Sequence, residues 1–456
     1  LHPAIHAGIL ARRELGEDMA TLRAQGIQPI DVVAVNLYPF RQAAARIGAT
    51  QEEVVEQIDI GGPSLLRAAA KNYRHVVAVV DAADYPAVLA SLRGGEVPLA
   101  QRYDLMRRVF AHTAAYDMAI AEHFAARGPD GRLEDAEFPP WLGLPLARRQ
   151  VLRYGENPHQ KAAWYHDLGS HSLEVGAPEP LQGKELSYNN LLDLNAAIAC
   201  LGAFERPTAV VVKHNTPCGV ASAGTLEAAY RLARAADETS AFGGVVALNG
   251  AVDAAVARAL AETFLEAVAA PSVEGEAREI LAAKKNLRLL EIGGLFPGAT
   301  VVRPRHEVRS VWAGLLVQEL DHGSPVDWST FRTVTKRSPT DAERRALHFA
   351  WRVVRQVRSN AIVFAAEDRT LAIGGGQTSR VEAVELAARK GGQALRGSAV
   401  ASDAFFPFRD GLDAAAKAGA TCVIQPGGSV RDAEVIAAAD EHGMAMLFTG
   451  FRHFRH

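Results

Sequence analysis

The sequence contains few cysteines, and their placement is that of free thiols. Only Cys200, Cys218 and Cys422 occur among 456 residues, an odd number at wide spacing. No CxxC pair is present, and a disulfide framework requires paired cysteines in an oxidising compartment. The pattern therefore excludes a disulfide-rich secreted domain and predicts a reducing, cytoplasmic location.

Long apolar runs and clusters of positive charge are absent as well. No apolar stretch approaches the length of a membrane span, and the first residues lack the basic, apolar and small-residue order of a signal peptide. Forty-nine Lys and Arg residues against 52 Asp and Glu residues give a formal charge of -3. There is no basic run or Arg and aromatic patch that would follow a phosphodiester backbone. We expect neither a membrane nor a nucleic acid as partner.

What is present is the alternation typical of an α/β protein. Hydrophobic residues make up 48% of the chain, enough to form the cores of two or three domains. Within residues 1–125, strand-type runs at 31–40 and 74–81 flank a helix-forming stretch at 58–73. Residues 126–148 are rich in Gly, Pro and charge, and this composition predicts a linker.

Residues 149–456 continue the alternation over a longer region. Helix-forming stretches such as 253–268 separate the apolar runs, and this order predicts a parallel α/β sheet. The length of the region favours two similar lobes, although no clear sequence repeat is visible. The apolar runs lie at 208–214, 242–249, 360–365, 371–376 and 421–428.

One strand-type run ends in two ionisable residues, Lys213 and His214. Burying both groups is costly unless each has a partner or a task. An imidazole accepts a proton near neutral pH, and a neighbouring ammonium stabilises an oxyanion or protonates a leaving group, so the pair suits acyl transfer. From the pair alone the structural alternative is favoured, in which Lys213 reaches solvent and His214 bonds a carbonyl. A zinc site with Cys218 would lack a second pair of ligands.

Glycine-rich turns follow two of the later runs. Residues 371–380 lead from a strand into three glycines and end at Arg380, so backbone N–H groups and a guanidinium can approach a ligand there. The stretch matches neither the dinucleotide fingerprint nor a phosphate loop that ends in GK[ST]. Residues 425–429 give a weaker signal of the same kind. Taken alone, both stretches are compatible with ordinary turns.

Arginines and aromatic rings gather at three further places. Arg153-Tyr154 and the C-terminal residues 451–456 combine guanidinium groups, which bind phosphate, with rings that stack on heterocycles. For the C-terminal residues the alternative is a solvated chain end. Residues 401–410 place three phenylalanines before Asp410, which suits either a pterin-like ring or an ordinary core.

In the first region the polar candidates are Tyr38, Asp59 and Lys71. Tyr38 ends a strand-type run, Asp59 precedes a Gly-Gly break, and Lys71 lies on the helix that follows. All three can therefore line one crevice. Spacing alone favours the alternative, in which each is an ordinary surface residue.

A series of collinear motifs resembles one family, the bifunctional purine biosynthesis proteins that join a formyltransferase to an IMP cyclohydrolase. The motifs cover essentially the whole chain, and their order is far more specific than any single glycine loop. They are LHPAIHAGIL, NLYPF, IDIGGPSLLRAAAKN, LRYGENPHQ, GKELSYNNLLDLNAA, VVVKHNTPCGVA, SAFGGVVALN, GLLVQELD, SNAIVFA, GGGQTSR, ASDAFFPFRDG, QPGGS and the aromatic and basic tail.

The resemblance implies the last two steps of IMP biosynthesis. A formyl group passes from the co-substrate 10-formyltetrahydrofolate to the amine of 5-aminoimidazole-4-carboxamide ribonucleotide (AICAR), and the ring then closes with loss of water. In the first step His214 accepts the amine proton, while Lys213 stabilises the oxyanion or assists departure of the folate nitrogen. In the second step Lys71 transfers protons, and Tyr38 and Asp59 orient the substrate. No metal or prosthetic group is implied.

The resemblance also assigns binding residues. Glu266 is the least sharply matched of them, because some family members have Asp there. The transferase nucleotide would contact Arg153, Tyr154, Gly243, Glu266, Asn360, Arg380, Phe405 and Arg452. The folate would contact Val381, Asp410, Ser429 and Val430. The cyclohydrolase nucleotide would contact Val35, Asn36, Asp59 and Ile60.

The implied fold is a methylglyoxal-synthase-like α/β domain over 1–125, followed after the linker by a duplicated cytidine-deaminase-like α/β region over 149–456, in a homodimer. Family members carry further cyclohydrolase residues before the LHPAIHAGIL motif, so we expect an incomplete first domain and absent or reduced cyclisation. Two alternatives remain, a monofunctional AICAR formyltransferase with a structural first domain and a nucleotide- or folate-binding regulatory protein. Intact Lys213 and His214 count against the second.

Overall fold

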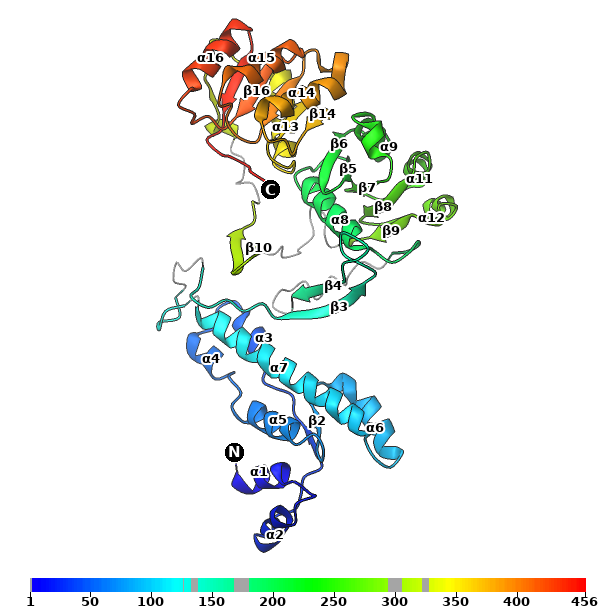
Figure 1. The fold of residues 1–456 in the computed structure, drawn as a ribbon, viewed down its shortest axis with the longest axis vertical. Coiled ribbons are helices and arrows are strands. Elements are labelled where there is room, and N and C mark those ends of the chain that lie inside the picture. Colours follow the sequence, from blue (N-terminus) through cyan, green and yellow to red (C-terminus); the bar gives the residue numbers. More distant parts are fainter. Residues whose placement is uncertain (1, 126, 133–137, 168–179, 294–305, 322–327) are drawn as a thin grey trace. The chain divides into compact units, whose positions relative to one another are not determined.

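The computed structural model describes residues 2–125, 127–132, 138–167, 180–293, 306–321 and 328–456. The chain forms two compact units, residues 1–147 with 167–169 and residues 148–166 with 170–456 (Figure 1). The unit boundary falls inside the predicted linker, whose last residues belong to a strand that begins at Leu146. Residues 126 and 133–137 of that linker lie outside the described residues. No helix in the described ranges is both long and apolar enough to span a membrane.

The first unit is built on a parallel pair of short strands with helices packed against it. Its core joins Ile9, Val33, Leu66, Ala78 and Val109, which come from both strands and three helices. Its elements are α1 (Pro3–Leu10), α2 (Gly16–Ala24), β1 (Val32–Ala34), α3 (Phe40–Ala44), α4 (Gln51–Val55), α5 (Gly61–Lys71), β2 (Val77–Val79), η1 (Ala82–Asp84), α6 (Tyr85–Arg93) and α7 (Leu99–Ala125).

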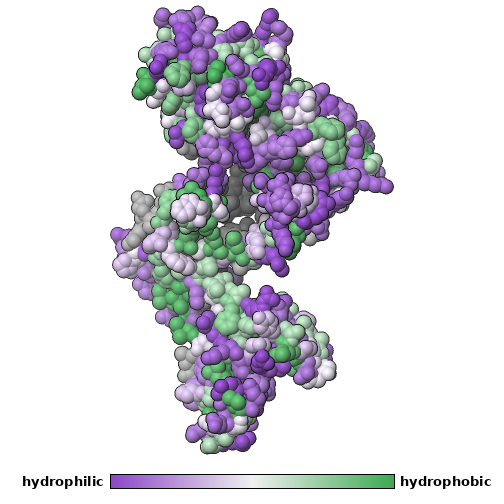
Figure 2. Space-filling model, viewed as in Figure 1, coloured by the Kyte–Doolittle hydropathy of each residue, from purple (hydrophilic) through white to green (hydrophobic). Residues whose placement is uncertain are grey.

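The predicted elements of this unit are present, but the strands are shorter than the apolar runs. Strand β1 pairs in parallel with β2 over three residues, and the chain leaves the strand before Pro39, which has no N–H group to donate to a ladder. The helix predicted within 58–73 is α5, which ends at Lys71. Many large apolar side chains of the unit remain exposed, among them Ile47 and Trp141. Figure 2 shows green, hydrophobic residues at the surface among the purple ones.

The second unit contains two open sheets flanked by helices. Its elements are β3 (Leu146–Leu152), β4 (Ala162–Asp167), α8 (Tyr188–Leu201), β5 (Thr208–Lys213), β6 (Thr216–Ser222), α9 (Leu226–Ala235), α10 (Glu238–Ala241), β7 (Gly244–Leu248), α11 (Ala254–Ala261), β8 (Leu265–Ala270), α12 (Gly275–Ala282), β9 (Arg288–Glu291), β10 (His306–Val311), β11 (Gly314–Glu319), η4 (Trp328–Thr330), β12 (Arg332–Thr333), α13 (Asp341–Val354), β13 (Ile362–Ala365), β14 (Thr370–Gly374), α14 (Arg380–Gly391), η5 (Gly392–Leu395), β15 (Ala399–Ser402), α15 (Arg409–Lys417), β16 (Cys422–Gln425), α16 (Asp432–Glu441) and β17 (Ala445–Phe448).

The two sheets repeat one topology. The strand order is β6-β5-β7-β8-β9 in the first and β14-β13-β15-β16-β17 in the second, where β12 adds a further edge. In each sheet the first three strands are antiparallel neighbours and the last three are parallel. The prediction of a parallel sheet is therefore wrong for the hairpins β5–β6 and β13–β14, because short loops join those strands and a parallel pair needs a long crossover.

Each sheet has one face in a core that both share. Val210 and Val212 of β5 point into this shared core, together with side chains of α8, α13 and the second sheet. Their neighbours Ala209 and Val211 point to the opposite face, which α9 and α11 cover. Side chains alternate between the two faces of β5, and each face lies against a core. The apolar residues of the strand are therefore all buried, which explains its uninterrupted valines.

The two sheets meet edge to edge at β6 and β14. The Val220 N–H donates to the Thr370 hydroxyl at 3.0 Å, and Ala221 bridges Arg369 in antiparallel register. Because the edges run antiparallel, the turn before β6 lies at the same end as the glycines that follow β14 (Figure 1). This topology brings two of the motifs found in the sequence to one end of the unit.

The stretch 253–268, predicted to be helical, instead contains a helix and a strand. Helix α11 ends at Ala261, and residues Leu265–Ala270 form β8, a central strand between β7 and β9. Ala267 and Val268 are fully buried on opposite faces of the sheet. Small apolar residues fit this doubly covered position despite their helix-forming composition, so packing overrides propensity here.

Candidate functional site

The Lys213-His214 pair occupies a tight hairpin turn between β5 and β6. Lys213 pairs with Thr216, so the loop consists of His214 and Asn215, with φ angles of 52° and 60°. These are the values of a two-residue turn whose central residues are both left-handed. The pair therefore ends an antiparallel strand, whereas ligand sites of open α/β sheets lie at the carboxyl ends of parallel strands.

A cavity of about 240 Å³ opens beside His214. The Asp193 carboxylate faces the turn and accepts the Asn215 N–H at 2.5 Å. Burial raises the pKa of Asp193, and the backbone N–H groups and cationic side chains of the turn oppose this effect. The lining residues are Glu156, Asn189, Leu192, Asp193, His214, Asn215 and Arg358.

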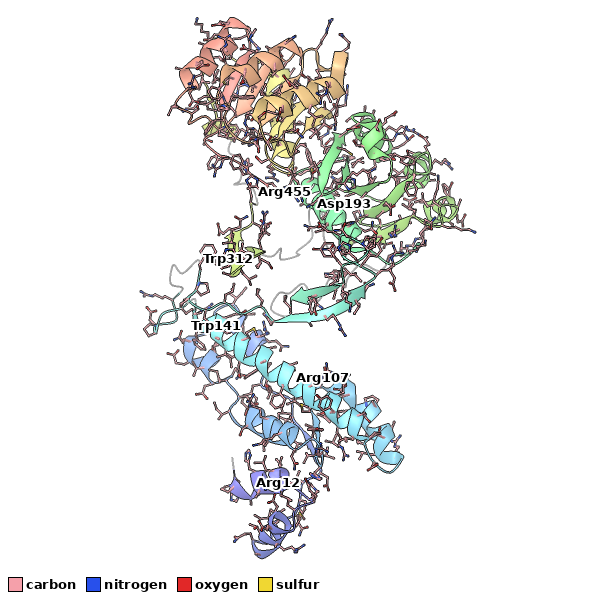
Figure 3. All side chains as sticks on the ribbon, in the orientation of Figure 1. Arg12, Arg107, Trp141, Asp193, Trp312 and Arg455 are labelled. Atoms are coloured by element: carbon pink, nitrogen blue, oxygen red, sulfur yellow. The ribbon has the colours of Figure 1, made fainter. Side chains whose placement is uncertain are left out.

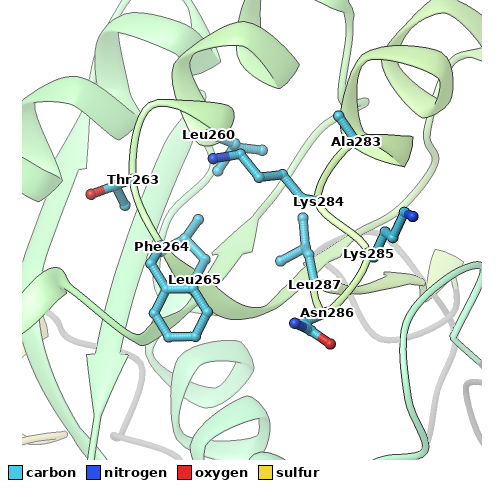
Figure 4. A pocket seen from close by; sticks show the side chains of 9 residues that line it. All are labelled: Leu260, Thr263, Phe264, Leu265, Ala283, Lys284, Lys285, Asn286 and Leu287. Atoms are coloured by element: carbon cyan, nitrogen blue, oxygen red, sulfur yellow. The ribbon is translucent and has the colours of Figure 1, made fainter.

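Lys213 lies next to Gly243, a second residue assigned to the nucleotide. The Lys213 ammonium donates to the Phe242 carbonyl at 2.5 Å. A methyl group built on Gly243 would lie 3.6 Å from that ammonium and 3.5 Å from the Phe264 ring. Phe264 also borders a cavity of about 270 Å³ at the amino ends of β8 and β9, where Lys284 and Lys285 lie at its rim (Figure 4). A methyl group at Gly243 would make ordinary van der Waals contacts, so the φ of 71° is what favours glycine at this position.

Arg153, Tyr154 and Glu266 lie around the segment that leads into α8. The Arg153 guanidinium donates to the Tyr154 hydroxyl at 3.0 Å and lies 4.8 Å from the centre of that ring. Arg153 also lines a cavity with residues 184–187. The Glu266 carboxylate is paired with the buried Arg288 at 2.6 Å, so it reaches a ligand only as half of an ion pair.

In the second lobe, Asn360 and Arg380 form one buried polar cluster. Arg380 donates to the Asn360 side-chain oxygen at 2.6 Å and to the Asp403 carboxylate at 2.5 Å. Asp403 is fully buried, and it also accepts from the Ser359 hydroxyl and from the Ala361 N–H. The guanidinium of Arg380 is therefore held in a fixed orientation at the start of α14.

The first lobe has uncharged residues at the positions that correspond to this cluster. At the equivalent end of β7, Asn249 accepts the Thr208 N–H at 2.7 Å, as Asp403 accepts the Ala361 N–H. The first residue of α9, equivalent to Arg380, is Leu226. The fold is thus satisfied by a leucine and an amide at these positions, so the charges of the second lobe serve another purpose than folding.

The C-terminal residues, for which a solvated end was the alternative, are tied into this region. The His453 N–H donates to the Asp403 carbonyl, and the Arg455 carbonyl accepts the Ser359 N–H. The Arg455 guanidinium reaches the Asn215 side-chain oxygen at 3.4 Å. Arg452 remains exposed and lies 4.3 Å from the centre of the Phe454 ring. The tail thus links the Asp403 cluster to the turn that carries His214.

The residues assigned to folate lie around the starts of α14 and α15. A methyl group on Gly411 would lie 4.0 Å from the Val381 Cα, so the two helix starts are neighbours. Asp410 is exposed and accepts the Gly411 N–H at 2.6 Å. Phe405 and Phe408 are exposed, and Arg431 lies over the Phe408 ring at 4.8 Å. The loop of Arg431 also carries Ser429, whose hydroxyl accepts the Arg431 N–H, and the fully exposed Val430.

In the first unit two of the three predicted catalytic residues lie at opposite ends of α5. Asp59 accepts the Gly62 N–H at 2.7 Å at the start of the helix, whereas Lys71 is its last residue. Eleven helical residues span about 15 Å. Tyr38, in the segment between β1 and α3, is exposed at 55%. The backbones of Asp59 and Lys71 are thus separated by the length of α5, and the expectation of one crevice stays a prediction.

Lys71 borders a groove of about 530 Å³ between α1, α5 and α7, where His6, Ser64 and Arg67 supply further polar groups. Of the residues assigned to the cyclohydrolase nucleotide, Ile60 is exposed beside Asp59, and Val35 extends β1 through its N–H to the Val79 carbonyl. Asn36 accepts a long hydrogen bond from Tyr85 at 3.4 Å. Asn36 and Ile60 are thus accessible to a ligand.

Comparisons with known proteins agree with the motifs. The family model of the AICARFT/IMPCHase bienzyme matches residues 69–390. The chain belongs to this family. The bifunctional purine biosynthesis protein PurH of Myxococcus xanthus is 58% identical over 462 residues, covering 100% of this chain and 88% of that protein. PurH proteins of Anaeromyxobacter sp. (strain K) and Magnetococcus marinus are 53% and 50% identical, with 88% and 87% of their lengths covered. The family predicted from the sequence is confirmed.

The structure adds residues to this AICARFT/IMPCHase chain that the sequence interpretation missed. Asp403 lies in a stretch that attracted attention only for its phenylalanines, and Asp193 lies in the motif GKELSYNNLLDLNAA without an assigned role. Arg358 and Arg455 reach the turn from distant parts of the chain. Within the described ranges, no group of three or more His, Cys, Asp or Glu residues is placed to hold a metal ion.

Proposed function

We propose that the chain transfers a formyl group from 10-formyltetrahydrofolate to AICAR and closes the product to IMP. Family membership over the full chain supports both reactions. The observation that carries the first is the exposed imidazole of His214, which follows Lys213 in the chain and lines a cavity with Arg358 of the second lobe. Positive charge and a base then meet where an anionic nucleotide and an acyl donor would react.

In this proposal His214 accepts a proton from the AICAR amine as the new C–N bond forms. The formyl oxygen becomes an oxyanion, which the Lys213 ammonium stabilises. The bond from the formyl carbon to the folate nitrogen then breaks, and that nitrogen takes up a proton. Lys213 already donates to the Phe242 carbonyl, so its ammonium is oriented before substrate arrives.

Binding in this proposal uses the groups already assigned. The fixed guanidinium of Arg380 and its partner Asn360 offer paired hydrogen bonds to the nucleotide. Folate would lie along the starts of α14 and α15, where the exposed Phe408 offers a ring face. The full nucleotide set is Arg153, Tyr154, Gly243, Glu266, Asn360, Arg380, Phe405 and Arg452. The folate set is Val381, Asp410, Ser429 and Val430.

Ring closure is assigned to the first unit, with Lys71 as proton carrier and Tyr38 and Asp59 as orienting groups. This reaction is intramolecular, so positioning and proton transfer supply most of the barrier reduction. The groove beside Lys71 and the exposed Tyr38 are consistent with the assignment. We assign a methylglyoxal-synthase-like fold to this unit and a duplicated cytidine-deaminase-like fold to the second.

A homodimer is the proposed assembly, and the cytoplasm is the proposed location. The β10–β11 hairpin carries a fully exposed Trp312 at its turn (Figure 3), and Leu315 and Leu316 on it are also exposed. An apolar hairpin of this kind suits burial against a second copy. For the location, the three cysteines are free and buried, and burial raises the pKa of Cys200 to about 12.

The test assays the two reactions separately, as tetrahydrofolate release with AICAR and as IMP formation from supplied formylated AICAR. His214→Ala should lower formyl-transfer turnover by about 100- to 10,000-fold, and Lys71→Ala should affect only closure. His442→Ala and Lys417→Ala, exposed residues outside the site, serve as matched controls. Full turnover in a Lys213→Ala/His214→Ala variant would refute the transferase assignment. Transfer without any closure would favour the monofunctional alternative.

A further inference from the structure

The turn that carries His214 is held in an unusual backbone conformation. Among the described residues, His214 and Asn215 are the only non-glycine residues with positive φ. Side chains are uncommon in this region because Cβ approaches the carbonyl oxygen, although asparagine and histidine are the better tolerated types. A turn of this kind needs support from its surroundings if the imidazole is to keep one orientation.

Helix α8 supplies that support through Asp193. The Asp193 carboxylate accepts the Asn215 N–H at 2.5 Å and is largely removed from solvent. Consecutive backbone N–H groups in a tight turn form a concave site for an anion, and the carboxylate occupies it here. The same contact brings a negative charge to the cavity that His214 lines.

The same face of α8 holds a second part of the candidate site. One turn before Asp193, the Asn189 amide donates to the Glu156 carbonyl at 3.2 Å. Glu156 lies in the loop that follows Arg153 and Tyr154. Residues four apart lie on one side of a helix, so α8 fixes the spacing between this loop and the His214 turn.

On the other side of the turn, a cation from the chain end completes the support. The Arg455 guanidinium donates to the Asn215 side-chain oxygen at 3.4 Å and to the Gln356 carbonyl at 3.0 Å. Asp193 and Arg455 therefore bind the backbone and the side chain of one residue, Asn215. His214 is left as the member of the turn whose side chain is free to act on a ligand.

We propose that Asp193 is a positioning residue for formyl transfer, which holds the His214-Asn215 turn and orients the imidazole toward the AICAR amine. This inference rests on the proposed role of His214 as the base. Asp193 contacts the turn and not the reacting atoms, so its effect reaches the reaction through His214. Removing it displaces the base from its productive position.

The experiment compares Asp193→Asn and Asp193→Ala with the parent chain. Asp193→Ala should lower kcat for formyl transfer by about 10- to 100-fold, as expected for a misplaced catalytic group, and should change KM for AICAR much less. Asp253→Ala is the matched control, because Asp253 also accepts a backbone N–H, at 2.8 Å, but caps α11 outside the site. The control should retain the kcat of the parent.

Rescue by the conservative variant separates positioning from a purely structural role. The side chain introduced by Asp193→Asn keeps an oxygen that can accept the Asn215 N–H, so its kcat should lie well above that of Asp193→Ala. An equal loss of kcat in both variants, in step with a lowered Tm, would overturn the inference.

The His214→Ala variant keeps the two proposals distinguishable. If His214→Ala is inactive while Asp193→Ala retains kcat within twofold of the parent, the positioning role is wrong and the base assignment stands. If His214→Ala itself retains full activity, the proposed function of the turn fails and the inference falls with it.

Discussion

Replacing Arg380 and Asp403 tests whether the charged cluster of the second lobe serves function rather than folding. Both side chains are buried, with 5% and 0% of their areas exposed, and the ion pair measures 2.5 Å. Arg380→Leu alone leaves the Asp403 charge buried with only the Ser359 hydroxyl and Ala361 N–H as donors. Breaking one partner of a buried pair costs about 3–5 kcal/mol.

The double variant Arg380→Leu/Asp403→Asn copies the first lobe, where Leu226 and Asn249 occupy the equivalent positions. The asparagine introduced by the Asp403→Asn change can accept the Ala361 N–H, as Asn249 accepts the Thr208 N–H at 2.7 Å. We therefore expect the second change to recover at least about 2 kcal/mol of the loss, because coupled neighbours deviate from additivity by this much. Formyl transfer should remain lost, since the guanidinium is gone.

Urea unfolding followed by circular dichroism measures the stability of the two single variants and the double variant, and tetrahydrofolate release measures activity. The single Arg380→Leu change should also lower the Tm by roughly 5–15 °C. A double variant no more stable than Arg380→Leu would refute the equivalence of the two lobes. A double variant with parental formyl transfer would refute the functional role of Arg380.

Three further predictions follow from other contacts. Burial raises the pKa of Glu343, but hydrogen bonds outweigh this effect and lower the pKa from its ordinary 4.5 to about 2. The charged Glu343 therefore stabilises the fold above pH 4.5, and this stabilisation is lost as the pH falls toward 2. Glu343→Gln should make the free energy of unfolding less dependent on pH in this range, and an unchanged dependence in urea unfolding would contradict this. A methyl group on Gly219 or Gly374 would overlap a helix carbonyl oxygen, whereas Gly224 has open space around it. Alanine at the first two positions should unfold the second unit, and alanine at Gly224 should leave the Tm nearly unchanged. Equal Tm values for the three variants would count against the packing argument. Trp312→Glu should convert a dimer to monomer in light scattering, and an unchanged mass would exclude the β10–β11 hairpin from the interface.

Much of the fold follows from local sequence pattern, and the exceptions have physical causes. The run 208–214 contains the strand β5 and the run 371–376 overlaps the strand β14, because uninterrupted apolar residues suit strands buried on both faces. The same rule explains the error at 253–268, where Leu265–Ala270 has helix-forming residues but lies between two strands. The antiparallel hairpins were not predicted, because the alternation of apolar runs carries no information on strand direction, which the loop length decides.

The candidate site was predictable only where a motif carried it. Lys213, His214 and Arg380 stand in motifs, and the structure places them at one end of the second unit. Asp193 and Arg455 reach the His214-Asn215 turn from positions 22 and 240 residues away in the chain. No local pattern marks such contacts, because they depend on how β6 meets β14 and on where the chain ends in space.

The two lobes together show how one scaffold was used twice with different chemistry. In the first lobe the polar residues lie in the hairpin turn, and the equivalent of the Arg380 cluster is leucine and asparagine. In the second lobe the cluster is charged, and the hairpin turn instead carries Asp368, whose carbonyl accepts the Ser222 N–H of the first lobe. Because β6 and β14 are antiparallel neighbours, the turn of one lobe and the cluster of the other reach the same end of the unit. The first lobe thus supplies the hairpin turn with its polar residues, and the second lobe supplies the charged cluster. A site built from both parts requires both lobes to be folded and joined.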